Sequence, residues 1–577
     1  MRGAAGRVVA EDHADRARHQ QVEAVELLRK EPAVDSSDRG GERGSGDRED
    51  HPALKPVRED LYPLLAQPFR YSLPLIIKFC DGFGDFADAV AHGFLLGAQE
   101  ILAHMPNQEL ADFAVKLALQ LGATYAEARW EREVANGFSL KNGVPQLAGF
   151  DDVEGLGLRL FFHGGVECLS TDYMDKRHVT ELVEKGIRNA NASAKMVREP
   201  VLLSQEERHR KSYAVKQKRK IENVDVDEKF EILADVEKAV KASGVPVPAR
   251  YFSLGDSVTE RYFTSSDGAR ISSVIPRVYF AFIITVAGGG ETRQRHFQLD
   301  QTGGYERLDA WKINEVVAGE GKALLKMMQE GVAAPEGPVD VVCAPEVVGI
   351  ACHESVGHPY EADRIFGREG AQAGESFLTP DDIGLRIGSE AATVVDDPTI
   401  EGSAGYYLYD DEGVQARRKM LMTNGVVTEF LHNRESAYKM GLNSNGSARA
   451  MDYESEAIVR MSNTFLLPGD YKDEELFEGI KKGVYIKSFM EWNIDDKRIN
   501  QKYVSSEAYL IEKGRITKPV KRAVLETTTK DFWSSMDAVG KKVEYFAGSC
   551  GKGEPMQDAP VWMGGPAARL RGMRLGV

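Results

Sequence analysis

Two histidines and a glutamate stand within six residues of one another, in the segment HESVGH that begins at His353 and ends at His358. Imidazole nitrogens bind divalent metals, and a carboxylate beside such a site can accept a proton from water that the metal activates. The pattern therefore predicts metal-assisted hydrolysis. His353 and His358 are the expected ligands, and Glu354 is the expected proton acceptor.

The two histidines stand five positions apart, whereas the common zinc-peptidase motif places them four apart. On an ideal α-helix, side chains at i and i+5 point roughly 140° apart, so both reach one metal only if the helix is distorted. A single π-type insertion would supply that distortion. Pro359 gives it a local cause, because proline lacks a backbone donor and biases the preceding residue away from helical angles.

The residues before the motif indicate limited access to water. The run at positions 341–352 is apolar enough to form a buried strand followed by the start of a partly buried helix, and Asp340 marks its polar edge. Histidines that follow directly on such a segment favour a metal site. The alternative is a pair of core histidines that are satisfied by hydrogen bonds.

A catalytic zinc site needs a third protein ligand and one open position. Cys550 is the best remote candidate, because the glycines of GSCGKG favour a loop whose backbone can approach another group closely. A free thiol in a turn is the alternative for this cysteine. Glu361 and Asp363 compete locally for the ligand role, although we favour solvated or supporting roles for both.

Three separated segments together resemble a known family. They are HESVGHPYEAD, NGSARAMDYESEAIVRMSNTFLLPG, and GSCGKGEPMQ with the tail VWMGGPAARLRGMRLGV. They are similar to the TldD branch of the TldD/PmbA peptidases, and the similarity runs from about Met105 to Val577. Pro359 departs from the glycine or other small residue expected there in many relatives, which puts only the local helix geometry in doubt.

The resemblance implies a zinc-dependent peptidase in which His353, His358 and Cys550 bind Zn²⁺ and Glu354 is the catalytic glutamate. It also implies a TldE/PmbA-like companion subunit that lacks the metal motif, and a homodimer is the other expected assembly. Because a thiolate ligand tempers the Lewis acidity of zinc, we expect unfolded or extended peptides as substrates. The alternative function is a non-catalytic binding or scaffold subunit with a structural metal site.

Three polar side chains outside these motifs, His432, Asn463 and Thr464, could assist a substrate carbonyl. We favour surface or supporting polar roles for them.

Composition excludes several other classes of protein. The chain has 577 residues, 42% of them hydrophobic, and a formal net charge of −16, which argues against a nucleic-acid surface. Its five scattered cysteines do not form a disulfide pattern, so we expect a reducing cytoplasm. Charged residues interrupt the apolar segment at 61–104, so no membrane span is expected there, and the N-terminus lacks a signal-peptide pattern.

Residues 1–104 differ in composition from the rest of the chain. Positions 1–58 carry little apolar periodicity, which is typical of disorder. We hypothesise that Met105 is the true initiator and that the preceding residues come from an upstream misreading of the gene. A genuine lineage-specific extension is the alternative.

The elements that must position these residues give an α+β fold. An N-terminal α+β domain is expected at 105–333 and a C-terminal domain of twisted antiparallel sheet, carrying the metal-binding helix, at 339–577. Helices are predicted at 110–121, with Asn107 as the cap, and at 176–190 and 310–331. Strands are predicted at 125–132, 137–141, 156–163, 166–171 and within 251–300, with Asn-Gly and Gly-rich hairpin turns. The charged stretch 205–229 is expected to be mobile.

Overall fold

An antiparallel sheet with unusually long strands forms the first part of the structure. The computed structural model describes residues 107–370 and 374–576, so the predictions for residues 1–104 lie outside the described residues. Seven strands pair in the order β3-β2-β1-β5-β6-β4, with β7 on β6, and only the β4–β6 pair is parallel. The strands are β1 (Tyr125–Lys141), β2 (Val144–Phe162), β3 (Gly165–Thr171), β4 (Arg210–Ala214), β5 (Ala249–Ser265), β6 (Arg270–Gly288) and β7 (Glu291–Thr302).

Tight turns set the register of this sheet. Asn142 and Gly143 join β1 to β2 with φ of 53° and 82°, the left-handed angles that a two-residue hairpin requires. The hairpin prediction is therefore confirmed. The two runs predicted at 125–132 and 137–141 are one strand, because both pair continuously with β2 and β5. The next turn lies at His163 and Gly164, one residue earlier than predicted.

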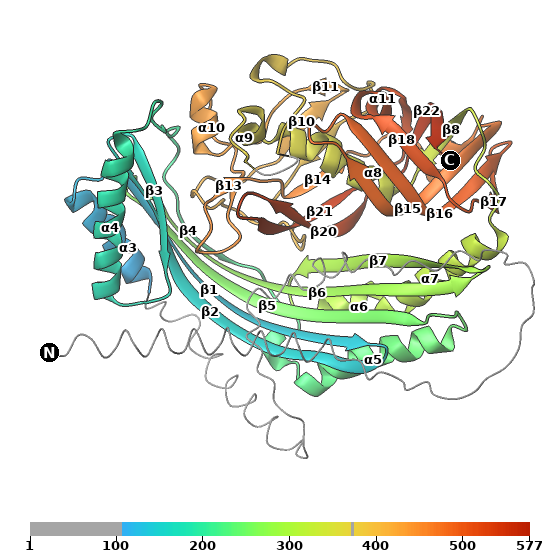
Figure 1. Cartoon of the computed structure of the whole chain (residues 1–577), viewed down its shortest axis with the longest axis horizontal. Coiled ribbons are helices and arrows are strands. Elements are labelled where there is room, and N and C mark those ends of the chain that lie inside the picture. Colours follow the sequence, from blue (N-terminus) through green and yellow to red (C-terminus); the bar gives the residue numbers. More distant parts are fainter. Residues whose placement is uncertain (1–106, 371–373, 577) are drawn as a thin grey trace, which may run out of the picture. The chain divides into compact units, whose positions relative to one another are not determined.

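Helices cover this sheet in two groups (Figure 1). Apolar side chains of α3 (Gln108–Gln120) and α4 (Lys176–Ala194) form one core with β1 and β2. Those of α5 (Val226–Ala242) and α7 (Ile313–Glu330) form a second core with β5 and β6. The predicted helices are confirmed, although α6 (Glu306–Trp311) is separated from α7 by a left-handed residue.

One local prediction for this part is wrong, and one stays a prediction. The charged stretch 205–229, which we expect to be mobile, contains β4, the short 3-10 helix Ile221–Asn223 and the start of α5. Its strand exists because β6 offers an edge with which β4 pairs. Asn107 occupies the cap position of α3 without capping it, because its side-chain amide donates to Glu154 instead.

The second part of the structure contains two larger sheets and a two-stranded ribbon. One sheet has the order β11-β10-β9-β14-β21-β20, in which only β14–β21 is parallel. Its strands are β9 (Val394–Asp396), β10 (Lys419–Thr423), β11 (Val426–Val427), β14 (Asn463–Leu466), β20 (Glu544–Lys552) and β21 (Gln557–Gly565). The ribbon joins β12 (Ala448–Arg449) to β13 (Ile458–Val459).

In the other sheet, the strand pairs return to their starting point. The order β15-β8-β22-β18-β16 is closed by pairing of β16 with β15, and β17 and β19 attach to β16 and β22. Its strands are β8 (Pro338–Cys343), β15 (Lys482–Ile494), β16 (Asn500–Glu512), β17 (Arg515–Pro519), β18 (Val524–Thr528), β19 (Met536–Val539) and β22 (Ala568–Gly576). The α+β class and the mainly antiparallel C-terminal sheets are as predicted.

The predicted division at 333–338 lies between the end of α7 and the start of β8, and it stays a prediction. After β8, the chain enters α8 (Pro345–Cys352) through Ala344. The remaining α-helices of residues 107–370 and 374–576 are short, namely α9 (Ala362–Ile365), α10 (Arg434–Lys439) and α11 (Thr529–Ser534). Among the described helices, none is long and apolar enough to cross a membrane.

Candidate metal centre

The residues from His353 to Gly357 form a π-helical turn that continues α8. The backbone N–H of His358 donates to the carbonyl of His353, five residues earlier. One extra residue in the turn moves His358 onto the face of the helix that His353 occupies. The two rings lie 4.8 Å apart between centroids, at 80° to each other. The predicted π-type insertion is confirmed.

Proline acts differently from the prediction. His358 keeps helical backbone angles, with φ of −59° and ψ of −47°, although it precedes Pro359. The missing N–H of proline is tolerated because a 3-10 turn, His358–Tyr360, follows and then ends the helix. The π turn, and not an extended residue, therefore carries the whole distortion.

Cys550 lies in strand β20 and not in the predicted loop. It pairs with Ala559 of β21, and the turn of this hairpin comes later, around Glu554 and Pro555. Side chains alternate along a strand, so Ser549 and Gly551 are exposed while Cys550 and Lys552 are buried on the opposite face. That face carries the sulfur towards the two histidines.

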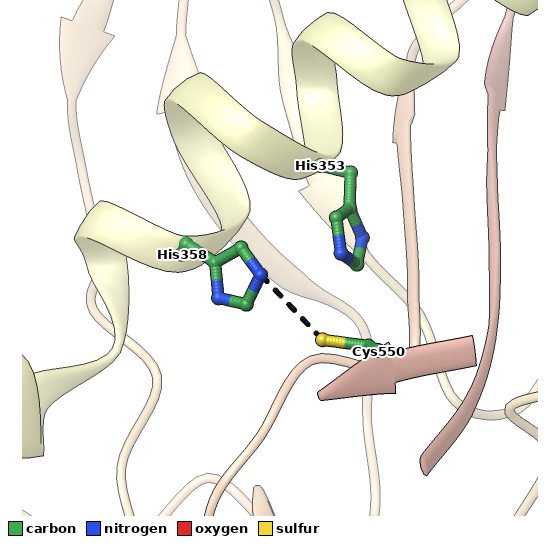
Figure 2. Close-up of side chains that lie close together, drawn as sticks. All are labelled: His353, His358 and Cys550. Atoms are coloured by element: carbon green, nitrogen blue, oxygen red, sulfur yellow. Dashed lines mark hydrogen bonds between the residues drawn. The ribbon is translucent and has the colours of Figure 1, made fainter. Parts of the chain in front are cut away.

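Figure 2 shows His353, His358 and Cys550 converging from the helix and the strand. The sulfur lies 3.5 Å from Nε2 of His358. One ligand atom from each residue can be chosen so that all three lie within 4.8 Å of one another. All three side chains are buried. Within the described chain, Nδ1 of His353 has no hydrogen-bond partner, which a buried ring nitrogen rarely tolerates unless it binds something. Two imidazoles and a thiolate are a ligand set that zinc favours.

The three groups influence the ionisation of one another. Burial alone would raise the pKa of the Cys550 thiol, but His358, His353 and the guanidinium of Arg460 outweigh burial, and the pKa lies well below its usual value. Burial would lower the pKa of His353, yet Cys550 raises it above its usual value overall. A thiolate is the form of cysteine that binds metal.

Glu361 and Asp363 lie behind the cluster. Oε2 of Glu361 lies 3.1 Å from Nδ1 of His358, on the side of the ring away from Cys550, and it accepts from Arg364 at 2.7 Å. Lys552 contacts Glu361 at 3.2 Å and Asp363 at 2.6 Å. Burial would raise the pKa of Glu361, but Lys552, His358 and Arg364 hold it well below its usual value. A carboxylate at Nδ1 fixes the ring of His358 and leaves Nε2 for a ligand.

Glu354 is held from a different direction. Trp492 donates to its Oε1 at 3.1 Å, and Arg498 contacts its Oε2 at 2.5 Å. Both partners come from the hairpin that joins β15 to β16. The glutamate is therefore next to the histidine cluster in sequence, and both of its carboxylate oxygens have a donor.

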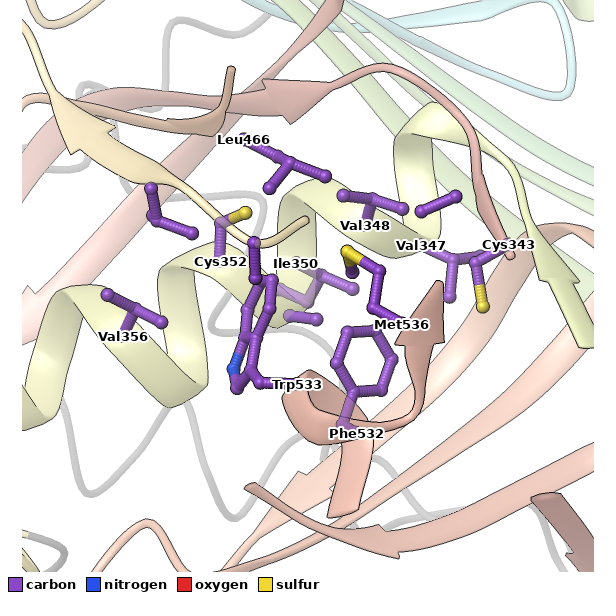
Figure 3. Close-up of a cluster of buried hydrophobic side chains, with 14 of the residues drawn as sticks. Cys343, Val347, Val348, Ile350, Cys352, Val356, Leu466, Phe532, Trp533 and Met536 are labelled. Carbon is purple, nitrogen blue, oxygen red and sulfur yellow. The ribbon is translucent and has the colours of Figure 1, made fainter. Parts of the chain in front are cut away.

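Close backbone packing fixes the helix against the sheet that carries Cys550. A Cβ added to Gly349 would lie 2.8 Å from the backbone nitrogen of Gly564 in β21, and one added to Gly357 would lie 1.8 Å from the sulfur of Met461. Figure 3 shows apolar side chains of α8 and the π turn packed against Phe532 and Trp533 of α11. The helix can approach β21 this closely because Gly349 lacks a side chain, and Gly357 leaves room for the side chain of Met461.

The other polar residues considered from sequence have structural partners. Asn463 and Thr464 are buried in hydrogen bonds with Asp397 and Asp396. His432 is held at 3.1 Å by Ser436, and burial lowers its pKa to about 4. These contacts agree with supporting polar roles, whereas a surface position is wrong for all three because they are buried.

Sequence reasoning missed three cations near the site. Lys552 could have been found, because it stands two residues after Cys550 and shares its face of the strand. Arg460 donates to the carbonyl of Cys550, and Arg498 pairs with Glu354. No local pattern marks these two arginines, since they meet their partners across 90 and 144 residues of chain.

The fold and the site define an α+β protein with a candidate metal centre. Several known proteins are similar to this chain in sequence. Residues 336–577 match the PmbA/TldA metallopeptidase C-terminal domain, and residues 219–324 match the central domain of the same metallopeptidases. A metalloprotease of Methanocaldococcus jannaschii is 30% identical over 79% of this chain and 97% of its own length. The chain belongs to the TldD/PmbA family of metallopeptidases.

Further relatives agree with this assignment. A protein of Saccharolobus solfataricus named as a zinc metalloprotease TldD homolog is 26% identical over 80% of this chain and 98% of its own length. Among solved structures, TldE from Thermococcus kodakarensis has a TM-score of 0.63 at 17% identity, covering 82% of this chain and 99% of that one. This structural likeness concerns the fold alone.

Proposed function

We propose that this chain is a zinc-dependent peptidase that hydrolyses unfolded or extended peptides. The observation that carries the proposal is the buried cluster of His353, His358 and Cys550, with Glu354 adjacent in sequence. Support also comes from membership of a metallopeptidase family and from a relative that is named as a zinc metalloprotease. The three clustered side chains would hold the ion, and Glu354 would be the general base.

Each residue has a separate part in this proposal. A zinc ion held here would supply Lewis acidity, which polarises a peptide carbonyl and lowers the pKa of water. Glu354 would accept a proton from the attacking water and return it to the leaving amine. Glu361 would keep the ring of His358 in position through Nδ1. The carboxylate of Glu354 is already oriented by Trp492 and Arg498.

A non-catalytic scaffold subunit with a structural metal is the alternative. Structural zinc sites usually have four protein ligands. In the part of the chain that the structure describes, the metal-binding group contains three residues. The carboxylate of Glu361 directs its Oε2 to the outer nitrogen of His358. The ligand number therefore favours a catalytic site with one open position.

The burial of the site supports the proposed substrate. His353 and Cys550 are only 5% and 4% exposed, so a narrow, extended segment fits such a site better than a folded domain. We propose a dimer with a TldE/PmbA-like companion, or with a second copy of this chain, in the cytoplasm. The four described cysteines are free thiols, which suits a reducing compartment.

Replacement of Glu354 tests the mechanism. Glu354→Gln should retain zinc while hydrolysis of an unstructured peptide falls by at least about a hundredfold, because the amide cannot accept the proton. Zinc content by native mass spectrometry and peptide turnover would be measured on one preparation. Glu474→Gln, at an exposed glutamate, is the matched control and should behave as the unmodified chain. Undiminished turnover in Glu354→Gln would contradict the proposed mechanism.

A further inference from the structure

Arg498 has an unusual backbone conformation for an arginine. It lies in the turn between β15 and β16, and its φ is 65°. Glycine adopts this left-handed region readily, whereas a side chain brings Cβ too close to the following carbonyl oxygen. An arginine at this position carries a steric cost that glycine would avoid. The presence of an arginine side chain at this left-handed position therefore needs an explanation.

Several hydrogen bonds hold the turn in this conformation. Asp495 accepts from three backbone N–H groups, those of Arg498 at 2.9 Å, Ile499 at 2.7 Å and Asn500 at 3.0 Å. The hydroxyl of Thr529 donates to the carbonyl of Arg498 at 2.6 Å. A strained residue that its surroundings fix so completely is typical of a functional site.

The guanidinium of Arg498 points at Glu354. Its Nη1 lies 2.5 Å from Oε2, and both side chains are only 9% exposed. Trp492, on the same hairpin, donates to Oε1. A carboxylate has about four lone-pair sites, so these two contacts leave acceptor positions for a water molecule. The hairpin therefore orients the carboxylate of Glu354 and leaves it able to accept a further hydrogen bond.

We propose that Arg498 is a positioning residue for Glu354, and that the left-handed turn exists to aim its guanidinium at the glutamate. This inference rests on the proposed function, in which Glu354 is the general base. Proton transfer depends on the orientation of the carboxylate, and a misplacement of about 1 Å can lower the rate about a hundredfold. Without Arg498, the carboxylate loses its cation and the constraint on its side-chain torsions.

Arg498→Gly separates this role from a structural one. Glycine suits the left-handed backbone, which should offset part of the stability lost with the buried ion pair, and zinc content should not change. The kcat for an unstructured peptide should fall by about ten- to a hundredfold with KM little altered. Millimolar guanidinium chloride should restore part of the kcat. Lys513→Gly is the matched control, because Lys513 has φ of 51° in the exposed turn from β16 to β17.

A second measurement needs neither metal nor activity. The protein is first freed of metal with a chelator. Glu354→Gln should then change the melting temperature of the original chain. The same substitution should change the melting temperature less in the Arg498→Gly variant, because that variant has already lost the ion pair. Equal shifts in the two backgrounds would show that the residues do not interact. Arg498→Asn, which also tolerates a left-handed backbone, should reproduce the loss of kcat if Arg498→Gly folds poorly.

The outcomes distinguish this inference from the proposed function. If Glu354→Gln is inactive while Arg498→Gly keeps full kcat, the positioning role is wrong and the general base stands. If Glu354→Gln is fully active, the proposed function itself fails. A change in KM alone would contradict the positioning role and assign Arg498 to substrate binding. A loss of kcat that accompanies unfolding, and that guanidinium does not restore, would assign Arg498 a purely structural role.

Discussion

Cys550 is the residue on which the metal proposal depends most, because it alone comes from outside the helix. Its low pKa has a physical origin in two imidazoles and the guanidinium of Arg460. Arg460 also holds the strand itself, through the carbonyl of Cys550. The thiolate is thus favoured by the charges around it and placed by its backbone contacts.

Removal of this sulfur should reduce metal binding without unfolding the chain. We expect Cys550→Ala to lower zinc occupancy while the zinc-free protein stays equally well folded, and Cys168→Ala, at an exposed thiol, to leave occupancy intact. X-ray absorption of the native protein should show a zinc–sulfur distance of about 2.3 Å. A shell of oxygen and nitrogen alone would transfer the ligand role to Glu361 or Asp363.

At the scale of elements, the site depends on a π turn pressed against a sheet. Gly357 ends the turn and faces the buried side chain of Met461. Met461 lies in the segment that follows Val459, and the carbonyl of Val459 accepts a hydrogen bond from Lys552 at 2.7 Å. One short segment therefore contacts both the helix with the histidines and the strand with the cysteine.

Gly357→Ala tests this packing. The added methyl group would overlap the sulfur of Met461, so stability should fall by about 1–3 kcal/mol and zinc affinity should fall with it. Gly319→Ala is the control, because it adds a methyl group to helix α7 with nothing within 4 Å and should stabilise by about 0.5–1 kcal/mol. Thermal unfolding and zinc titration would measure both. Equal stability of the two variants would contradict the packing argument.

At the scale of the whole molecule, buried ion pairs connect the first sheet to the helix that carries the histidines. Arg295 of β7 contacts Glu346 at the start of α8 at 2.9 Å and Glu320 of α7 at 2.7 Å. It also donates to the carbonyl of Phe489 in β15 at 2.7 Å. The position of α8 is therefore set partly by elements that precede it by many residues.

Glu346 should make stability depend on pH. Burial raises its pKa from 4.5 to about 7 although Arg295 opposes the shift. The folded chain therefore binds this proton more tightly than the unfolded chain, so the contribution to stability falls as pH rises from about 4.5 to about 7, by at most about 1.4 kcal/mol per unit. Melting temperatures at pH 5 and pH 7.5 should show the original chain losing stability relative to Glu346→Gln. Parallel pH profiles for the two proteins would rule this out.

Assembly is the other prediction at this scale. If the chain works with a metal-free homologue, light scattering should show a dimer, and addition of the companion should raise hydrolysis of unfolded peptides without supplying a catalytic residue. Exposed apolar side chains at the hairpin beside the site, Trp492 and Ile499 at 43% and 39% exposed, suit a protein contact. A monomer that is fully active and indifferent to the companion would count against this assembly.

The amino-acid sequence by itself predicted those features of this protein that depend on neighbouring residues. The five-residue spacing of the histidines predicted a π turn, because an ideal α-helix would point positions i and i+5 in different directions. Asn142 and Gly143 set a hairpin, since few other residues adopt their backbone angles. Interactions of this kind involve neighbours in the chain, and the amino-acid sequence therefore predicts them directly.

Only the tertiary structure decided how distant residues meet. The glycines around Cys550 suggested a loop, yet pairing with β21 makes the segment a strand, because a neighbouring strand satisfies backbone groups that glycine leaves accessible. Arg498 reaches Glu354 across 144 positions, and nothing in its own neighbours indicates that target. Contacts of this kind depend on packing of the whole chain, which combines many weak interactions that no local pattern contains.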